Sequence, residues 1–280
     1  MSNRDIAPAA ETSLPRAVIN ELGRRLFDAE RSRSTLPPLT DTYPDMSVAD
    51  AYAVQLEYAR LRRRGGAVLV GHKVGATSRA IQELFDIDIP DYGHLFDDMR
   101  CDPAVPIAID ELIQPLVEPE IAFVLGDGLR GPGITASDVI EAASGVVACL
   151  EVIDSRIESW RIRLADTVAD NGSSARFVVG SEIVPITTDL AAEAVVFERS
   201  GDIVGEGTGA AVLGHPAEAA AWLANALGSF GVAMAPGSFV LSGSITSAVP
   251  ARRGDRFAAR FATLGTVSCT MDEGGSPDDG

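Results

Sequence analysis

The chain has 280 residues, of which 46% are hydrophobic, and a formal net charge of -17. That hydrophobic content supports a sizeable core and excludes a chain that is disordered throughout. The negative charge argues against nucleic acid and anionic membrane as partners, because both are bound through Lys and Arg surfaces. It leaves a small anionic substrate open, since a metal ion and a few local basic groups can attract a carboxylate within a negative overall field.

The cysteines and the N-terminus bear on the compartment. Cys101, Cys149 and Cys269 are odd in number, widely spaced and form no Cys-x-x-Cys, so neither a disulfide framework nor a thiolate metal site is indicated. Residues 1–15 contain no apolar signal core, and Glu or Asn interrupts the longest apolar runs before they could span a bilayer. These features predict a cytoplasmic protein.

Two helices are expected after a flexible arm at residues 1–15. Apolar residues at helical spacing predict the first helix over residues 17–31. Ser47 and Asp50 provide capping side chains for the second, which is expected to run to about Arg64, before a Gly-Gly pair. We interpret both helices as scaffold.

An apolar run at residues 67–70 predicts a strand whose end carries Lys73. A lone lysine is ordinarily a solvated surface charge, but the flanking glycines and apolar residues favour a constrained amine here. A short helix capped by Thr77 or Ser78 is expected to follow. Residues 86–99 are expected to form a long loop, either a lid or site loop or the interface loop of an oligomer.

Glu118 and Glu120 lie in a run that otherwise reads as a buried strand, and Glu151 lies in a second such run. An unpaired ionised carboxylate in such a place is costly or becomes neutral, so a cation is expected nearby. On an extended segment Glu118 and Glu120 point to the same face. Three carboxylates without thiols or histidines suit Mg²⁺ or Mn²⁺ rather than zinc. The alternative is that the first two pair with arginines on a half-exposed strand.

The rest of the chain alternates strands with a few helices. A Gly-rich segment at 205–209 resembles a dinucleotide fingerprint, but no further βαβ units surround it, so we expect a turn where two backbones approach closely. Runs of strands with few inserted helices favour an α+β fold over a doubly wound sheet. The other expected elements are a helix from Thr135 or Ser137, a strand at 145–153, an Asn-Gly turn at 170–174, a strand at 176–179, a hairpin at 193–204, a helix at 216–230, strands between 238 and 271, and a flexible tail at 272–280.

Seven segments in consistent order resemble the 2-keto-4-pentenoate hydratases (2-hydroxypenta-2,4-dienoate hydratases) and the related 4-oxalocrotonate decarboxylases, within the fumarylacetoacetate hydrolase superfamily. They cover most of the chain from residue 50 onward. They are GHKVGATS (71–78), PDYGHLFDDM (90–99), VEPEIAFVLG (117–126), CLEVIDSR (149–156), DTVADNGSSARFVVG (166–180), GAAVLGHP (209–216) and PGSFVLSGSITSAVP (236–250).

The resemblance implies the mixed β-roll of that superfamily, with a helical N-terminal part at 16–95 that includes the site loop and a β-rich, metal-binding catalytic part at 96–271, forming one structural unit. It implies a divalent metal bound by three glutamates, an active-site lysine, an acidic loop residue and a polar substrate contact. These roles fall on Glu118, Glu120, Glu151, Lys73, Asp91 and Ser173.

Two positions depart from the family pattern. Pro119 replaces the small residue often found between the paired glutamates, and Gly172 stands where Ala is common. Neither removes a functional group. Pro119 lacks a strand N–H and therefore suggests an edge strand or a bulge.

The function implied is hydration of a 2-hydroxy-2,4-dienoate through its 2-oxo-3-enoate tautomer, in aromatic ring catabolism, with Lys73 and Asp91 as acid and base and Ser173 orienting the carboxylate or the water. Proximity of the metal is expected to lower the pKa of Lys73. A homo-oligomer and an association with an aldolase or decarboxylase of the same pathway are also implied. Three alternatives stay open: decarboxylation of a 2-oxo-3-enedioate, hydrolysis of an acylpyruvate C–C bond, and a non-catalytic keto-acid-binding subunit. The acid at Asp91 favours the hydratase, because family decarboxylases tend to lack it.

Overall fold

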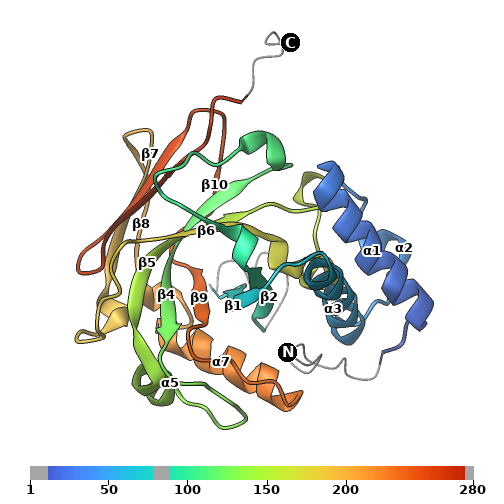
Figure 1. Cartoon of the computed structure of the whole chain (residues 1–280), viewed down its shortest axis with the longest axis horizontal. Coiled ribbons are helices and arrows are strands. Elements are labelled where there is room, and N and C mark those ends of the chain that lie inside the picture. Colours follow the sequence, from blue (N-terminus) through green and yellow to red (C-terminus); the bar gives the residue numbers. More distant parts are fainter. Residues whose placement is uncertain (1–11, 78–88, 275–280) are drawn as a thin grey trace.

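The computed structural model describes residues 12–77 and 89–274. The N-terminal helices are α1 (Arg16–Ser32), α2 (Leu39–Thr42) and α3 (Val48–Arg64), and α1 packs against α3 (Figure 1). Helix α3 begins with the expected capping box, in which Ser47 and Asp50 bond each other's backbone N–H groups. Both long helices expected from the sequence are confirmed. No helix in the described ranges is long and apolar enough to cross a membrane.

A curled mixed sheet runs through the molecule beside these helices (Figure 1). Its order within the described chain is β2-β1-β9-β4-β5-β6-β3, with β10 paired to β4. The pairs β1–β9 and β3–β6 are parallel and the others antiparallel. The strands are β1 (Leu69–Gly75), β2 (Asp91–Phe96), β3 (Arg100–Cys101), β4 (Leu116–Leu125), β5 (Ala143–Ile153), β6 (Ser174–Val179), β9 (Phe239–Ser244) and β10 (Val249–Pro250).

A second sheet has the order β12-β11-β7-β8 and is antiparallel throughout. It consists of β7 (Ala194–Arg199), β8 (Asp202–Thr208), β11 (Arg256–Phe261) and β12 (Gly265–Thr270). The remaining α-helices of the described residues are α5 (Ala136–Ala142), α6 (Leu164–Ala169) and α7 (Pro216–Ser229). Helices combined with a mixed curled sheet confirm the α+β class.

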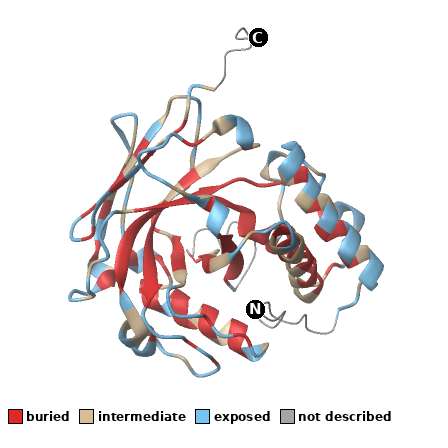
Figure 2. Ribbon diagram, in the orientation of Figure 1, coloured by how far each residue is buried: buried red, intermediate tan, exposed pale blue. Residues whose placement is uncertain are grey.

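Strands β4 and β5 form the centre of the fold and are buried along most of their length (Figure 2). Alternate residues of β4 enter two different hydrophobic clusters, because side chains alternate between the faces of a sheet. Val117, Ile121 and Phe123 pack in the cluster that contains α7, whereas Ala122 and Val124 pack in the cluster that contains α1 and α3. Burial on both faces explains why these strands are nearly continuous apolar runs.

The segment expected to be a loop at 86–99 contains strand β2 instead, and that expectation is wrong. All six residues of β2 are buried, and the strand pairs with β1. Gly93 is not a loop signal: a Cβ there would meet the carbonyl oxygen of Asn171 at 2.3 Å, so only glycine allows this close approach. The short helix expected from Thr77 or Ser78 onward falls largely on residues 78–88, outside the described residues.

Two further details refine the sequence analysis. Gly205 and Gly207 lie inside β8 and not in a turn, but the expected close approach is present, since a Cβ on Gly207 would meet the Ile245 carbonyl oxygen at 2.8 Å. Pro119 is not on an edge strand, because β4 lies between β5 and β9. The irregularity that proline suggests does occur next to it, where the β4–β9 register shifts between Glu120 and Ala122.

Candidate active site

Three glutamates converge on one face of the central strands. Glu118 and Glu120 share β4, and Glu118 lies directly opposite Glu151 of β5. Each of the three offers a carboxylate oxygen that lies within 4.8 Å of the other two. Glu120 is 1% exposed and Glu151 is fully buried. All three belong to the face of the sheet that looks toward the N-terminal helices, the same face as Ala122 and Val124.

The electrostatics of this cluster call for a cation. Burial raises the pKa of Glu118 to about 7, with Glu151 and Asp91 adding to the rise and Lys73 opposing it. The pKa of Glu120 is also raised, by burial and then by the other two glutamates. Glu120 accepts a hydrogen bond from the Gly243 N–H (2.8 Å), whereas neither carboxylate oxygen of Glu151 has a hydrogen-bond partner among the described residues. An all-carboxylate set with free oxygens fits a hard divalent cation.

Lys73 lies in the middle of β1 and is 5% exposed. Its Nζ lies 3.6 Å from Oε2 of Glu151. Burial lowers the pKa of Lys73, but Glu151, Asp91 and the two β4 glutamates together raise it above its ordinary value. The lowering expected from a bound divalent cation would act against these carboxylates and stays a prediction.

Asp91 begins β2, opposite Gly75 of β1, and is 2% exposed. Burial raises the pKa of its carboxyl group, while Lys73 and a hydrogen bond from Thr167 oppose the rise. Thr167 Oγ1 donates to Asp91 Oδ2 at 3.2 Å. A Cβ on Gly75 would lie 2.1 Å from Asp91 Oδ1 and 3.2 Å from Lys73 Nζ, so glycine at this position lets the acid and the amine meet.

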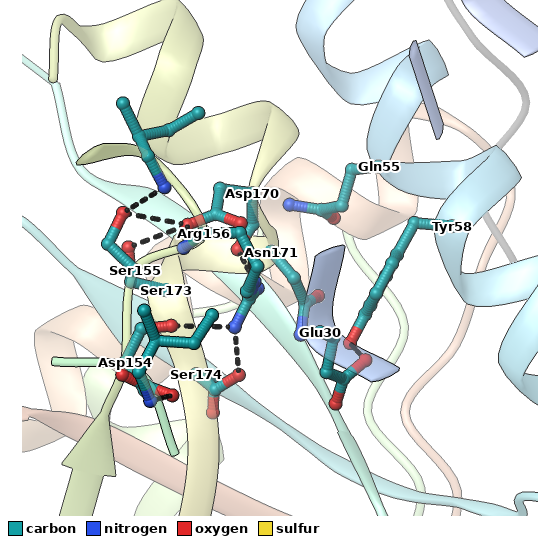
Figure 3. Close-up of polar contacts among 12 residues, drawn as sticks. Glu30, Gln55, Tyr58, Asp154, Ser155, Arg156, Asp170, Asn171, Ser173 and Ser174 are labelled. Atoms are coloured by element: carbon teal, nitrogen blue, oxygen red, sulfur yellow. Dashed lines mark hydrogen bonds and ion pairs between the residues drawn. The ribbon is translucent and has the colours of Figure 1, made fainter. Parts of the chain in front are cut away.

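Ser173 occupies a buried turn whose Gly172 lies against Lys73. Its hydroxyl donates to Asp170 Oδ2 at 3.2 Å (Figure 3). Asp170 in turn forms an ion pair with Arg156 (2.6 Å), and both side chains are buried. The hydroxyl is therefore engaged with the Arg156–Asp170 pair and not with a glutamate of the cluster. A substrate contact for Ser173 stays a prediction.

The histidines do not form the dyad that the acylpyruvate hydrolase alternative needs. His72 and His94 are cross-strand neighbours on β1 and β2, with ring centroids 5.2 Å apart. Each alternates with the site residues along its strand, so the rings point to the opposite face from Lys73. His215 caps α7 and lies 3.5 Å from Asp189. Across the described ranges, no histidine forms an ion pair with a glutamate.

Gly75, Thr167 and Gly243 also contact the site, although none of them was among the six expected site residues. Gly75 had a signal, since it flanks Lys73 in the tight GHKVG segment. Thr167 and Gly243 stand in two of the segments that carry the resemblance, but nothing local marks them, because their contacts to Asp91 and Glu120 join residues 76 and 123 positions apart.

A cavity of about 520 Å³ lies elsewhere, beside α1 and α3. None of the six predicted site residues lines it. Three of its five arginines have carboxylate partners, Arg62 with Glu30, Arg156 with Asp170 and Arg176 with Glu111, and Arg33 donates to the Asp110 carbonyl. The cavity is therefore lined largely by paired charged side chains and is not the place where the glutamates converge.

Comparisons with known proteins show what the chain is similar to. The family model described as fumarylacetoacetate (FAA) hydrolase C-terminal matches residues 101–272. The chain is 45% identical over 258 residues to a 2-hydroxyhexa-2,4-dienoate hydratase of Comamonas testosteroni, covering 91% of this chain and 98% of that protein. It is 44% identical over 223 residues to a 2-hydroxypent-2,4-dienoate hydratase of Pseudomonas putida, covering 79% and 100%. Among solved structures, a 4-oxalocrotonate decarboxylase from Pseudomonas putida G7, complexed with magnesium and adipate, superimposes with a TM-score of 0.90 at 37% identity, covering 93% and 100%.

Proposed function

Because this chain belongs to the fumarylacetoacetate hydrolase family, we propose that it is a metal-dependent hydratase that adds water to a 2-hydroxy-2,4-dienoate and yields a 4-hydroxy-2-oxoalkanoate. The observation that carries the proposal is the convergence of Lys73 and Asp91 on three glutamates, of which Glu120 and Glu151 are buried and Glu118 is partly exposed. Relatives at 44–45% identity are named as hydratases of this substrate class.

We assign the metal to Glu118, Glu120 and Glu151, and we propose Mg²⁺, with Mn²⁺ as the alternative. When bound there, the cation would supply Lewis-acid polarisation of the substrate's 2-oxygen and carboxylate. The oxygens of Glu151, which accept no hydrogen bond from the described residues, and the raised pKa values of Glu118 and Glu120 support this assignment.

Lys73 and Asp91 supply the proton transfers. The reaction needs two of them: ketonisation of the dienol, and then addition of water at C4 with protonation at C3. Lys73 is held as an ammonium by the surrounding carboxylates, so its Nζ can donate a proton. Asp91 has a raised pKa and can take a proton from water through its carboxylate. The raised pKa of Asp91 lies closer to neutral pH, which suits a general base, and a bound divalent cation is expected to lower the pKa of Lys73 toward the same range.

Ser173 would orient the attacking water. Its hydroxyl proton is donated to Asp170, which leaves the oxygen lone pairs to accept a hydrogen bond. That arrangement suits a water molecule, which can donate, better than the substrate's carboxylate, which only accepts.

A second candidate is decarboxylation of a 2-oxo-3-enedioate, favoured by the superposition on a 4-oxalocrotonate decarboxylase. The buried acid at Asp91 supports hydration over this reaction. Side-by-side incubation with a monocarboxylate dienoate and with an enedioate, followed by mass analysis, separates the two. We expect the monocarboxylate to gain water; loss of CO₂ from the enedioate alone would overturn the proposal.

We also propose a cytoplasmic homo-oligomer that works beside an aldolase or decarboxylase of the same catabolic sequence. All three cysteines are unpaired, which suits a reducing compartment. Light scattering coupled to gel filtration measures the assembly directly, and a monomer at micromolar concentration would count against it.

A further inference from the structure

A strained turn lies against the catalytic lysine. Asn171, Gly172 and Ser173 have φ values of 58°, 58° and 56°, so three successive residues adopt the left-handed conformation. Residues other than glycine enter this region at a cost and normally singly. Such strain persists only where the surroundings over-determine it, and it clusters at functional sites. We call residues 171–173 the left-handed turn.

The first set of bonds that holds this turn joins it to β2. Asn171 Oδ1 accepts from the His94 N–H at 2.7 Å, and its Nδ2 donates to the His94 carbonyl at 3.0 Å. Strand β2 is an edge strand, so one amide side chain satisfies both outward groups of His94. The turn is thereby fixed to the strand that carries Asp91.

The second set anchors the turn's start through the buried Arg156–Asp170 pair (Figure 3). Asp170 accepts from the Ser155 hydroxyl, from the Arg156 N–H and guanidinium, and from the Ser173 hydroxyl. Arg156 also donates to the carbonyls of Asp170, Asp154 and Ser174. Each guanidinium nitrogen of Arg156 donates at least one hydrogen bond, and a buried pair bonded in this way makes a rigid base.

The left-handed turn packs against the side chain of Lys73. A Cβ on Gly172 would lie 2.7 Å from Lys73 Cε, so the lysine chain is in contact with the turn's backbone. On the other side, the Lys73 Nζ reaches Glu151 at 3.6 Å. The lysine therefore lies between the turn and the glutamates, and its amine is placed by both.

We propose that Asn171 is a positioning residue for the hydration reaction, acting through Lys73. It clamps the left-handed turn to β2, and the turn fixes the lysine's amine between Asp91 and Glu151. This assignment rests on the proposed function, because it gives Lys73 the role of proton donor.

The chain offers a matched control for a test. Asn225 of α7 makes the same two bonds to one backbone residue: Oδ1 accepts from the Ile134 N–H and Nδ2 donates to the Ile134 carbonyl, each at 2.8 Å. Asn171→Ala and Asn225→Ala thus remove equivalent bonds, one beside the site and one away from it. We expect kcat to fall by about tenfold to 100-fold in Asn171→Ala, with KM and metal affinity little changed, and to stay near wild type in Asn225→Ala.

If Asn171 acts by positioning Lys73, the effect of Asn171→Ala on kcat should depend on Lys73, whereas a general loss of structure should lower kcat with or without it. Asn171→Ala and Lys73→Ala form a double-mutant cycle. In a Lys73→Ala background, Asn171→Ala should cost little further activity, because the lysine through which Asn171 acts is already absent. An equal loss of kcat in both backgrounds, or equal kcat in Asn171→Ala and Asn225→Ala, would overturn the assignment. Asn171→Gly suits the left-handed φ and gives the same comparison if the alanine variant does not fold.

A readout that needs no turnover keeps this inference distinct from the proposed function. Reductive methylation of Lys73, followed by peptide mass spectrometry, should proceed several-fold faster in Asn171→Ala than in wild type or Asn225→Ala. If the wild-type protein showed no hydratase activity, the proposed hydration would be wrong. Faster labelling of Lys73 in Asn171→Ala would still support the positioning of the lysine by Asn171. Unchanged labelling of Lys73 in the Asn171 variants would contradict it.

Discussion

Glu118 and Glu151 lie directly opposite each other across the antiparallel pair β4–β5, so two carboxylates occupy facing positions of one ladder. Like charges in such positions are destabilising, and burial increases the effect. Lys73 is the one described cation that forms an ion pair with either of them, and it reaches only Glu151. A divalent cation is the simplest species that would stabilise the whole set.

Removal of one ligand should abolish tight metal binding. We expect Glu151→Gln to weaken Mg²⁺ affinity by more than about 100-fold. Substitution of a residue that only hydrogen-bonds a metal ligand typically lowers metal affinity about 10- to 100-fold, and loss of the ligand itself should cost more. Isothermal titration calorimetry measures this. Glu193→Gln is the control: Glu193 is equally buried but bonds Thr263, and its metal titration should match wild type. An unchanged titration in Glu151→Gln would remove that residue from the ligand set.

Lys73 should matter for turnover and not for holding the metal. Lys73→Met removes a positive charge 3.6 Å from Glu151, so Mg²⁺ should bind at least as tightly as in wild type. The same variant should lose about 10² to 10⁴ in kcat, the range for a positioned acid or base. Weaker metal binding together with retained kcat would contradict the assigned role.

Asp91 should behave as the partner of Lys73. We expect Asp91→Asn to lower kcat by about 10² or more while metal affinity stays within a few-fold of wild type. Asp97→Asn serves as control, since Asp97 lies just beyond the same strand and its side chain accepts a hydrogen bond only from the Val68 N–H among the described residues. Equal kcat values for the two variants would exclude Asp91 from the chemistry.

Asp50 predicts a pH dependence of stability that is separate from catalysis. Burial tends to raise its pKa, but hydrogen bonds from Leu14, Ser47 and Ser13 lower it well below its ordinary value of 3.8. A depressed folded-state pKa gives stability that is present above pH 4 or so and is lost as pH falls further.

Asp50→Asn should therefore reduce the free energy of unfolding by about 1–2 kcal/mol at pH 7, the size of a capping interaction. The difference from wild type should shrink as pH falls below about 4, since the wild-type carboxyl group then becomes protonated. Urea unfolding at several pH values measures it, with Asp45→Asn, which is exposed, as the reference. A difference that stays constant with pH would show that the ionised form is not what matters.

The sequence alone supports much of this site, because its chemistry is local. The spacing of Glu118 and Glu120 predicts their shared face, and the apolar runs around them predict burial. Those are properties of a single strand. The resemblance to a known family then supplies the roles of Lys73, Asp91 and Ser173, and the structure brings the first two to the glutamates.

Contacts between segments that are distant in the chain could not be predicted from the sequence. The composition of residues 86–99 predicts a loop, yet β2 forms there because β1 pairs with its backbone and Gly93 admits the backbone of Asn171. Gly75 flanks Lys73 in the sequence, but its close approach to Asp91 joins two strands. At both positions the glycine is required by close packing between segments, and only the tertiary structure shows which segments meet.

The central claim is tested most directly by metal-dependent hydration of 2-hydroxypenta-2,4-dienoate. The protein is freed of metal with EDTA, and loss of the dienoate's ultraviolet absorbance is followed before and after Mg²⁺ is added, with mass analysis of the product. We predict no enzymatic loss without metal, rapid loss with it, and a product heavier than the substrate by one water. Full activity in EDTA, or absorbance loss without gain of water, would contradict the account.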